Sequence, residues 1–498
     1  MAGRKDVPFR LFNLRYVPLF AAFLILGIFS ISLSYLAAAL IIAVALLCLV
    51  ALVFTRSLTR GVAVVLALTL VVGYLSAFTA LHVRNEVGLE GYYTVHCRVV
   101  GVREEEGVYY AEADGLTCGG KRYAGGITIQ TDKPLAEGDR VTAIGSVSIR
   151  KITFSTAFDA LQYRKGKKYA MTADVCDVTP GRPTLAARIR GKIRDLLLRY
   201  QGDRANGFSY AMLFGDTSYM EGADLKTMRS VGVAHVFAVS GLHVGVLSAA
   251  ILSLLKKLKA KGYVRLLVMI PILGFYAYLA GFTPSVLRAS VMILLYLTAS
   301  LLGMRYDDLS ALSFAAVLIL IIRPLYLFDV SFLLSFLALF GIVSLASPLE
   351  RAFKKRRMPS FLASALALSV STSVAILPVS ATIFGSVSLL GVLLNVLIVP
   401  LASLTYLLTL ILLPLAALYS GFGGVLIMLR SLPLAMIEMG EWGASLNVTG
   451  EHSFATWEIV LYYATLLFVG KYSLARPKVK LVAGAVVFAT FGILLFAL

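Results

Sequence analysis

Two histidines and a serine interrupt an apolar stretch of this chain, HVFAVSGLHVGVL at residues 235–247. His235 and His243 lie about 80° apart around a helix, and Ser240 precedes His243 by about one turn, so one helix face could carry all three. Ionisable groups in apolar surroundings are costly unless a partner or a water-filled cavity receives them. The stretch therefore suggests one of three roles: metal binding, hydrolysis by a serine–histidine pair, or the polar lining of a path.

Metal binding and hydrolysis are the weaker interpretations of this stretch. The chain has no HExxH, no HxHxDH and no CxxC pattern that would complete a zinc site, so we expect no metal and no cofactor. A hydroxyl and an imidazole on one helix rarely align for proton transfer beside an oxyanion hole. A hydrolase using Ser240 nevertheless stays open as an alternative.

Other polar residues lie in apolar stretches where lipid would not accept them. They are Asp216, Arg288, Asp329, Ser331, Ser335 and Asn395. Gly241, beside Ser240, is a further candidate because its small size allows close helix approach. The serines could instead bond their own helix, and Asn395 could link helices. Arg288 and Asp329 could form a structural ion pair, or Arg288 could meet a phosphate while Asp329 holds it in position. Together with the two histidines and Ser240, these residues predict an aqueous path through the protein, and Arg288 with Asp329 could also serve a small-solute or proton-coupled transporter.

Long apolar runs must position these residues. The chain has 498 residues, of which 59% are hydrophobic, and a mean hydropathy of +0.85. Runs of about 20 apolar residues recur, which predicts a polytopic α-helical membrane protein with about 11–13 transmembrane helices. The thirteen candidate spans are residues 17–34, 36–54, 62–82, 233–255, 264–281, 286–304, 309–323, 326–347, 361–384, 388–417, 423–446, 453–470 and 479–498.

The distribution of positive charge predicts the orientation. The net charge is +19, and lysine and arginine concentrate in short segments between the apolar runs, as cytoplasmic loops do. The N-terminus is therefore expected in the cytoplasm, as part of an uncleaved anchor. Three crossings within residues 1–90 then place the following soluble segment outside the cytoplasm.

Residues 91–180 have the composition of a small β domain. Five short runs rich in Val, Ile, Tyr and Thr alternate with turn signals, and PLAEGDRVTAIGSV resembles a strand of an OB-fold, a barrel that commonly binds single-stranded nucleic acid. Its local positive charge lies at Arg164, Lys165, Lys167 and Lys168. In an oxidising compartment Cys97 could bridge to Cys118 or to Cys176, or all three could be buried thiols.

A basic amphipathic helix is predicted after the β domain, over residues 185–200, within a segment that extends from 181 to 204. Its cations include Arg188, Arg190, Lys192 and Arg194. Such a helix could lie on lipid headgroups, or it could receive an incoming polyanion at the outer face. Residues 205–498 form the second membrane domain.

Five ordered motifs resemble the ComEC-type competence channel family, the DNA internalization competence proteins of bacteria. They are YAMLFGD, HVFAVSGLHVG, GFTPSVLRA, RPLYLFDVSFLLSFLALFGI and ILPVSATIFGSVSLLGVLLNVLIVP, and the stretch FDALQYRKGKKYAMTADV resembles the family's extracytoplasmic domain. The resemblance covers nearly the whole chain. The chain is similar to the form without a C-terminal metallo-β-lactamase-like domain.

The resemblance implies a channel, not an enzyme, that passes one DNA strand through the bacterial cytoplasmic (inner) membrane during natural transformation. The implied partners are single-stranded DNA, membrane lipid, a separate extracytoplasmic DNA receptor, a nuclease, and a cytoplasmic helicase or single-strand-binding protein. The chain has no P-loop, so the driving energy is expected to come from elsewhere.

Overall fold

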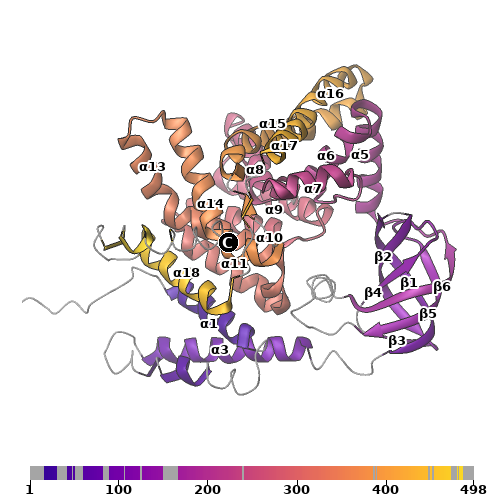
Figure 1. Ribbon diagram of the computed structural model, residues 1–498, viewed down its shortest axis with the longest axis horizontal. Helices are drawn as coiled ribbons and strands as arrows, with labels where there is room; N and C mark the ends of the chain where they lie inside the picture. The colour runs from indigo at the N-terminus through magenta and orange to yellow at the C-terminus, as the bar shows by residue number, and fades with distance from the viewer. Residues whose placement is uncertain are drawn as a thin grey trace, which may run out of the picture.

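The computed structural model shows a helical membrane block and a small β-barrel joined by one long helix (Figure 1). It describes residues 16–30, 42–50 without 48, 60–81, 89–149 without 106, 124 and 125, 167–446 without 238, 239, 385, 386 and 389, then 449–450, 454–472 and a few positions from 479 to 489. Four predicted features therefore lie wholly or mostly outside the described residues: Arg164, Lys165, the candidate span at 36–54 and the last candidate span.

Five strands close into a barrel. The strands are β1 (Gly91–Glu105), β2 (Val108–Cys118), β4 (Gly126–Thr131), β5 (Arg140–Ile149) and β6 (Lys167–Thr179), with the short β3 (Lys121–Arg122) at the edge of β2. They pair in the order β1-β5-β6-β4-β2, and β2 returns to β1. Only the β4–β6 pair among these is parallel. This Greek-key barrel confirms the OB-like expectation.

Alternation of buried and exposed side chains forms the barrel core. β5 alternates strictly, with Val141, Ala143 and Val147 inside, as a half-buried strand requires. Tyr169 is also buried in this core, so its role there is packing. Tyr92 and Tyr93 on β1 are exposed and remain available for stacking.

Two helices near the N-terminus, α1 and α3, pack against each other backbone to backbone. α1 (Tyr16–Ser30) crosses α3 (Arg60–Leu81) at Gly27 and Gly73, where an added Cβ would meet carbonyl oxygens of the opposite helix. Small residues permit this close approach, the usual basis of helix association in lipid. The pair contacts α11 and the short helix η3 of the main block.

The main block begins with amphipathic and short helices and continues with long apolar ones. Its elements are α5 (Leu185–Gln201), α6 (Asp203–Phe214), α7 (Gly222–Ser230), η2 (Ala234–Val236), α8 (Gly241–Lys257), α9 (Gly262–Leu279), α10 (Pro284–Leu301), α11 (Asp308–Ile322), η3 (Pro324–Phe328), α12 (Val330–Gly341), the π-helix η4 (Ile342–Ala346), α13 (Ser347–Lys355), α14 (Ser360–Phe384), β7 (Val387–Ser388), α15 (Leu390–Leu418), η5 (Ser420–Phe422), α16 (Gly423–Leu429), α17 (Ser431–Ser445), β8 (Thr449–Gly450) and α18 (Thr456–Val469).

The helix lengths confirm a polytopic membrane protein. Within the described residues, seven helices are long and apolar enough to cross a membrane: α3, α9, α10, the continuous α12–η4–α13, α14, α15 and the α16–α17 pair. α1, α11 and α18 are shorter apolar helices.

The predicted span at 233–255 begins too early, because the helix in the structure starts only at Gly241. The chain forms a 3-10 turn at η2, and the helix begins only at Gly241, with Ser240 in extended conformation as its N-cap. Serine before an apolar run is a helix-start signal that competes with continuation of the helix. His235 and His243 therefore do not share one helix face.

Candidate functional site

The polar residues of the HVFAVSGLHVG motif lie at the first turn of α8. The Ser240 backbone N–H donates to His243 Nδ1 at 3.5 Å. The His243 ring stacks on Tyr406 of α15, with 4.5 Å between ring centroids, and the side chain is only 1% exposed. His235 is exposed on the preceding turn. In this structure His243 thus faces an aromatic ring, not open water.

Arg288 lies beside this turn and is also buried. Its guanidinium contacts Gly241 so closely that a Cβ there would overlap it, and its Nη1 donates to the Ser335 carbonyl oxygen. The guanidinium also lies 5.9 Å from the ring centroid of Phe336. Ser335 therefore contributes its backbone, not its hydroxyl.

Asp329 does not pair with Arg288 in the part of the chain that the structure describes. Its Oδ1 accepts the backbone N–H groups of Ser331 at 2.7 Å and of Phe332 at 3.2 Å, so the carboxylate is the N-cap of α12. The Ser331 hydroxyl lies 3.5 Å from that of Ser285 on α10. The ion pair considered from the sequence is thus absent, because helix capping occupies Asp329.

Two further candidates stand apart from this cluster. Asp216 accepts the backbone N–H and the hydroxyl of Ser218, at 3.0 and 2.6 Å, in the turn after α6. Asn395 lies on α15, and its buried Oδ1 has no hydrogen-bond partner among the described residues. The structure therefore brings Ser240, Gly241, His243, Arg288 and Ser335 together, with Asp329 and Ser331 at the top of the neighbouring α12.

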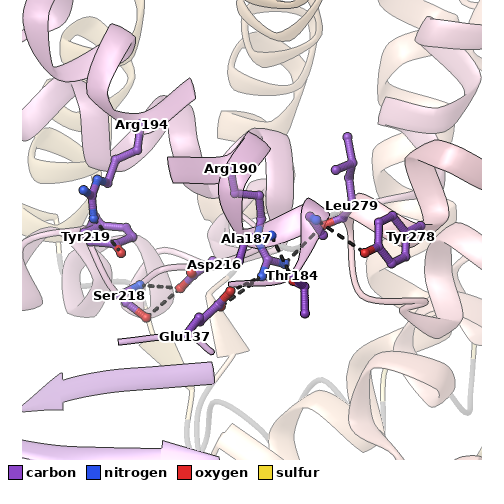
Figure 2. A network of polar contacts seen from close by, with 11 residues as sticks. Glu137, Thr184, Ala187, Arg190, Arg194, Asp216, Ser218, Tyr219, Tyr278 and Leu279 are labelled. Carbon is purple, nitrogen blue, oxygen red and sulfur yellow. Dashed lines mark hydrogen bonds and ion pairs between the residues drawn. The ribbon is translucent and has the colours of Figure 1, made fainter. Parts of the chain in front are cut away.

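A polar network joins the barrel to α5 and the membrane block (Figure 2). Arg190 of α5 pairs with Glu137 of the β4–β5 loop at 2.8 Å and donates to the Leu279 carbonyl oxygen at the end of α9. The Tyr278 hydroxyl accepts the Ala186 backbone N–H at 3.4 Å. One arginine thus links three parts of the molecule, and Glu137 carries no motif by which sequence analysis could have found it.

The linker before α5 fits closely against the same barrel loop. Gly138 has φ +102°, and a Cβ on it would lie 2.7 Å from the Pro183 Cα. Arg98 of β1 donates to the Arg182 carbonyl oxygen at 2.6 Å. Glycine at position 138 is required both by the left-handed backbone and by this approach.

The basic candidates of α5 fall into two groups. Arg190 and Arg194 are engaged: Arg194 pairs with Asp195 at 3.0 Å, and its guanidinium carbon lies 5.1 Å from the ring centroid of Tyr219. The hydrogen bonds to Asp195 and Tyr219 raise the pKa of Arg194 despite its partial burial. Arg188 and Lys192 are exposed and form no ion pair among the described residues. Arg199, which sequence analysis did not single out, shares their exposed face.

A family model for competence proteins matches residues 212–476, more than half of the chain. The chain belongs to the competence protein family. The matched segment contains all of the polar cluster around α8, α10 and α12, whereas the barrel and α5 precede it. The resemblance seen in the ordered motifs is thereby confirmed.

Two curated relatives match parts of this competence protein. It is 31% identical over 199 residues to ComE operon protein 3 of Bacillus subtilis (strain 168), which covers 39% of this chain and 24% of that protein. It is 31% identical over 170 residues to an uncharacterized protein of Aquifex aeolicus (strain VF5), covering 34% of this chain and 38% of that protein. The alignments thus span about a quarter and about two fifths of these relatives. No solved structure matches the chain.

Cys97 and Cys176 of this competence protein are buried in the barrel, and Cys118 is half-buried there. Cys97 on β1 and Cys176 on β6 both neighbour β5, which lies between them, so their Cα atoms are separated by about two strand spacings, ~9 Å. That exceeds the usual reach of a disulfide. Cys118 on β2 pairs in register with Val95 of β1, two residues from Cys97. This diagonal position across the two strands puts the Cα atoms of Cys97 and Cys118 about 7–8 Å apart, which also exceeds the usual reach of a disulfide.

Proposed function

We propose that this chain is the membrane channel through which one strand of DNA enters the bacterial cytoplasm during natural transformation. Membership of the competence protein family supports this role, as does similarity to ComE operon protein 3. The barrel and α5 receive the strand at the outer face, and the helices bearing Gly241, Arg288 and Ser335 surround its path. A DNA receptor, a nuclease and a cytoplasmic helicase or single-strand-binding protein are the proposed partners.

The observation that carries the proposal is a row of free cations on α5 beside an OB-like barrel. Arg188, Lys192 and Arg199 fall within about 40° of one another around the helix and extend over about 16 Å along it. Asp195 lies in the same row but is engaged by Arg194. The opposite face of α5 packs on the membrane block through Ala186 and Leu197. A cationic row held rigidly at the mouth of a membrane block suits a phosphate backbone.

Passage of the strand requires the membrane helices to separate. His243 is 1% exposed, and Arg288 and Asp329 are each 7% exposed, so in the proposed channel the helices at this level must open before a strand passes. The helices that must part are α8, α10 and α12, because Gly241, Arg288 and Ser335 meet at their junction.

Strand import into vesicles tests the proposal. The full chain is reconstituted into liposomes, and a fluorescent single-stranded oligonucleotide is added outside, followed by a nuclease. We expect a protected, internal fluorescent strand that depends on the protein, and much less protection of a duplex of equal length. Absence of protected strand in vesicles that contain correctly folded protein of both orientations would contradict the proposal.

No observation favours the hydrolase alternative. His243 Nδ1 accepts the backbone N–H of Ser240 itself, and the ring is sealed against Tyr406. The Ser240 hydroxyl is therefore not positioned by this nitrogen as a nucleophile would be. The transporter alternative relied on an Arg288–Asp329 pair, and this pair does not form because Asp329 caps α12.

A further inference from the structure

The first turn of α8 and the side chain of Arg288 bring two positive groups into contact. The unpaired N–H groups of a helix N-terminus carry roughly half a positive charge. Gly241, the first residue of α8, lies directly against the Arg288 guanidinium. Two positive groups in contact inside a low-dielectric block repel each other unless an anion joins them.

No such anion is supplied by the described residues. Arg288 is 7% exposed, and its Nε has no hydrogen-bond partner. The nearest contacts of the guanidinium are a carbonyl oxygen and an aromatic ring, neither of which carries a full negative charge. Asp329 is engaged by the N–H groups of α12. A buried cation without a counter-ion is costly, and the Nε–H of Arg288, which lacks a hydrogen-bond acceptor, adds to this cost.

We propose that the N-terminus of α8 and Arg288 together form a binding site for a phosphate-type oxyanion. The Arg288 guanidinium and the N–H groups of Gly241 and Leu242 at the start of α8 are the donors, an arrangement that matches the geometry of phosphate oxygens. The N–H of His243 is already engaged by Ser240. Ser240 and Gly241 are half-buried, so an anion can reach the site from that side. Glycine at position 241 allows the approach because it has no Cβ.

The phosphate group could belong to a DNA strand, to a lipid headgroup or to inorganic phosphate. Assignment to the strand rests on the proposed function, whereas the anion site itself does not. In the strand case the oxyanion would draw the guanidinium from the Ser335 carbonyl oxygen, which now joins α10 to α12.

Thermal unfolding of the full chain in detergent tests the site. Inorganic phosphate is titrated into gluconate buffer at constant ionic strength. For the wild type we expect the unfolding midpoint to rise by about 1–2 °C at a phosphate concentration of ten times Kd. Arg288→Met should lose this rise while unfolding at or above the wild-type midpoint without phosphate, because an uncompensated cation is gone. Arg323→Met, an exposed arginine beside Tyr326, is the control and should keep the rise.

A second pair of variants keeps the test decisive if Arg288→Met does not fold. Gly241→Ala places a Cβ against the Arg288 guanidinium. It should raise the phosphate concentration needed for a given rise of the unfolding midpoint at least tenfold. Gly245→Ala, one turn further along α8, has no atom within 4 Å of the added Cβ and should respond like the wild type. An equal response in Gly241→Ala and Gly245→Ala would overturn the site.

Parallel arms identify the source of the phosphate. The same variants are measured with an oligo(dT) strand and in nanodiscs of phosphatidylglycerol or phosphatidylcholine. An Arg288-dependent shift with any of these ligands supports the site, and no shift of the wild type with all of them overturns it. Vesicle import that persists in Arg288→Met overturns the strand as ligand. If the wild-type protein imports no strand but still shows the Arg288-dependent phosphate shift, the proposed function is contradicted and the site is supported.

Discussion

At the scale of single residues, burial decides what each polar side chain can do. His243 and Arg288 occupy the apolar motifs that sequence analysis singled out, yet each is almost fully covered. Ser335 acts through its carbonyl oxygen, and Asp329 through helix capping. The residue types were therefore correctly selected, while their partners followed from local helix chemistry that competes with ion pairing.

The thiol of Cys176 illustrates the same effect outside the membrane. Burial raises its pKa, although hydrogen bonding to Thr131 and the charge of Lys133 act in the opposite direction. A raised pKa leaves less thiolate at a given pH, so alkylation should require a higher pH than for an ordinary cysteine. Mass spectrometry of the reduced protein should show Cys176 reacting with iodoacetamide at least tenfold more slowly than half-buried Cys118 at pH 8. Equal rates in the folded protein would contradict this prediction, and unfolding should abolish the difference.

A pair of substitutions separates the two roles available to Asp329. Asp329→Ala removes the N-cap of α12 and should lower stability by about 1 kcal/mol, whereas Asp329→Asn keeps a good cap and should cost much less. Thermal unfolding measures both. If strand import falls in Asp329→Asn while stability is kept, the negative charge itself serves transport. Similar losses of stability in the two variants would exclude the capping role.

At the scale of secondary-structure elements, α5 is the part that couples the barrel to the membrane block. Its buried face packs on the block, its exposed face carries the free cations, and Arg190 links the β4–β5 loop to the end of α9. Gly138 allows this loop to meet the linker at Pro183. An amphipathic helix at this junction is thus a rigid connector as well as a charged surface.

A double-mutant cycle on Glu137 and Arg190 should reveal this coupling. The side chains are 30% and 20% exposed, so the pair is partly screened, and we expect a coupling energy of about 1 kcal/mol. The more exposed Arg194–Asp195 pair serves as the control, with an expected coupling near zero. Hydrogen–deuterium exchange of residues 133–140 and 184–195 measures the local opening free energies from which the coupling energy is calculated. Equal coupling in both pairs would contradict a special role for the Glu137 link.

At the scale of the whole molecule, the chain combines a small β-barrel with a helical membrane block in which Arg288 is buried. Positive charge lies on α5 and at the C-terminal end of α8, and of these two helices α5 adjoins the barrel (Figure 1). This asymmetry predicts where a strand first binds. It does not depend on how the membrane helices later separate.

Salt dependence measures this asymmetry. Replacing Arg188, Lys192 and Arg199 by glutamine should reduce the slope of log K against log salt for oligo(dT) binding by about 2, since each phosphate contact on a single strand contributes about 0.7. Fluorescence anisotropy on the full chain in nanodiscs provides K. The matched control replaces Lys256, Lys257 and Lys259 at the far end of α8 and should leave the slope unchanged. An equal effect of the two triple variants would contradict the α5 row as the receiving surface.

The sequence by itself determined the membrane class, the small barrel, the amphipathic α5 and the motifs of the competence family, because hydrophobic periodicity and turn residues act locally. It could not determine that a helix begins at Gly241 with Ser240 as its N-cap, that Asp329 and Arg288 stay apart, or that Glu137 reaches Arg190. Those outcomes depend on contacts between residues distant in the chain, such as His243 on Tyr406 and Gly241 on Arg288. Only packing of the helices against one another decides which groups are covered, and in a low-dielectric interior that decides which charges need a partner.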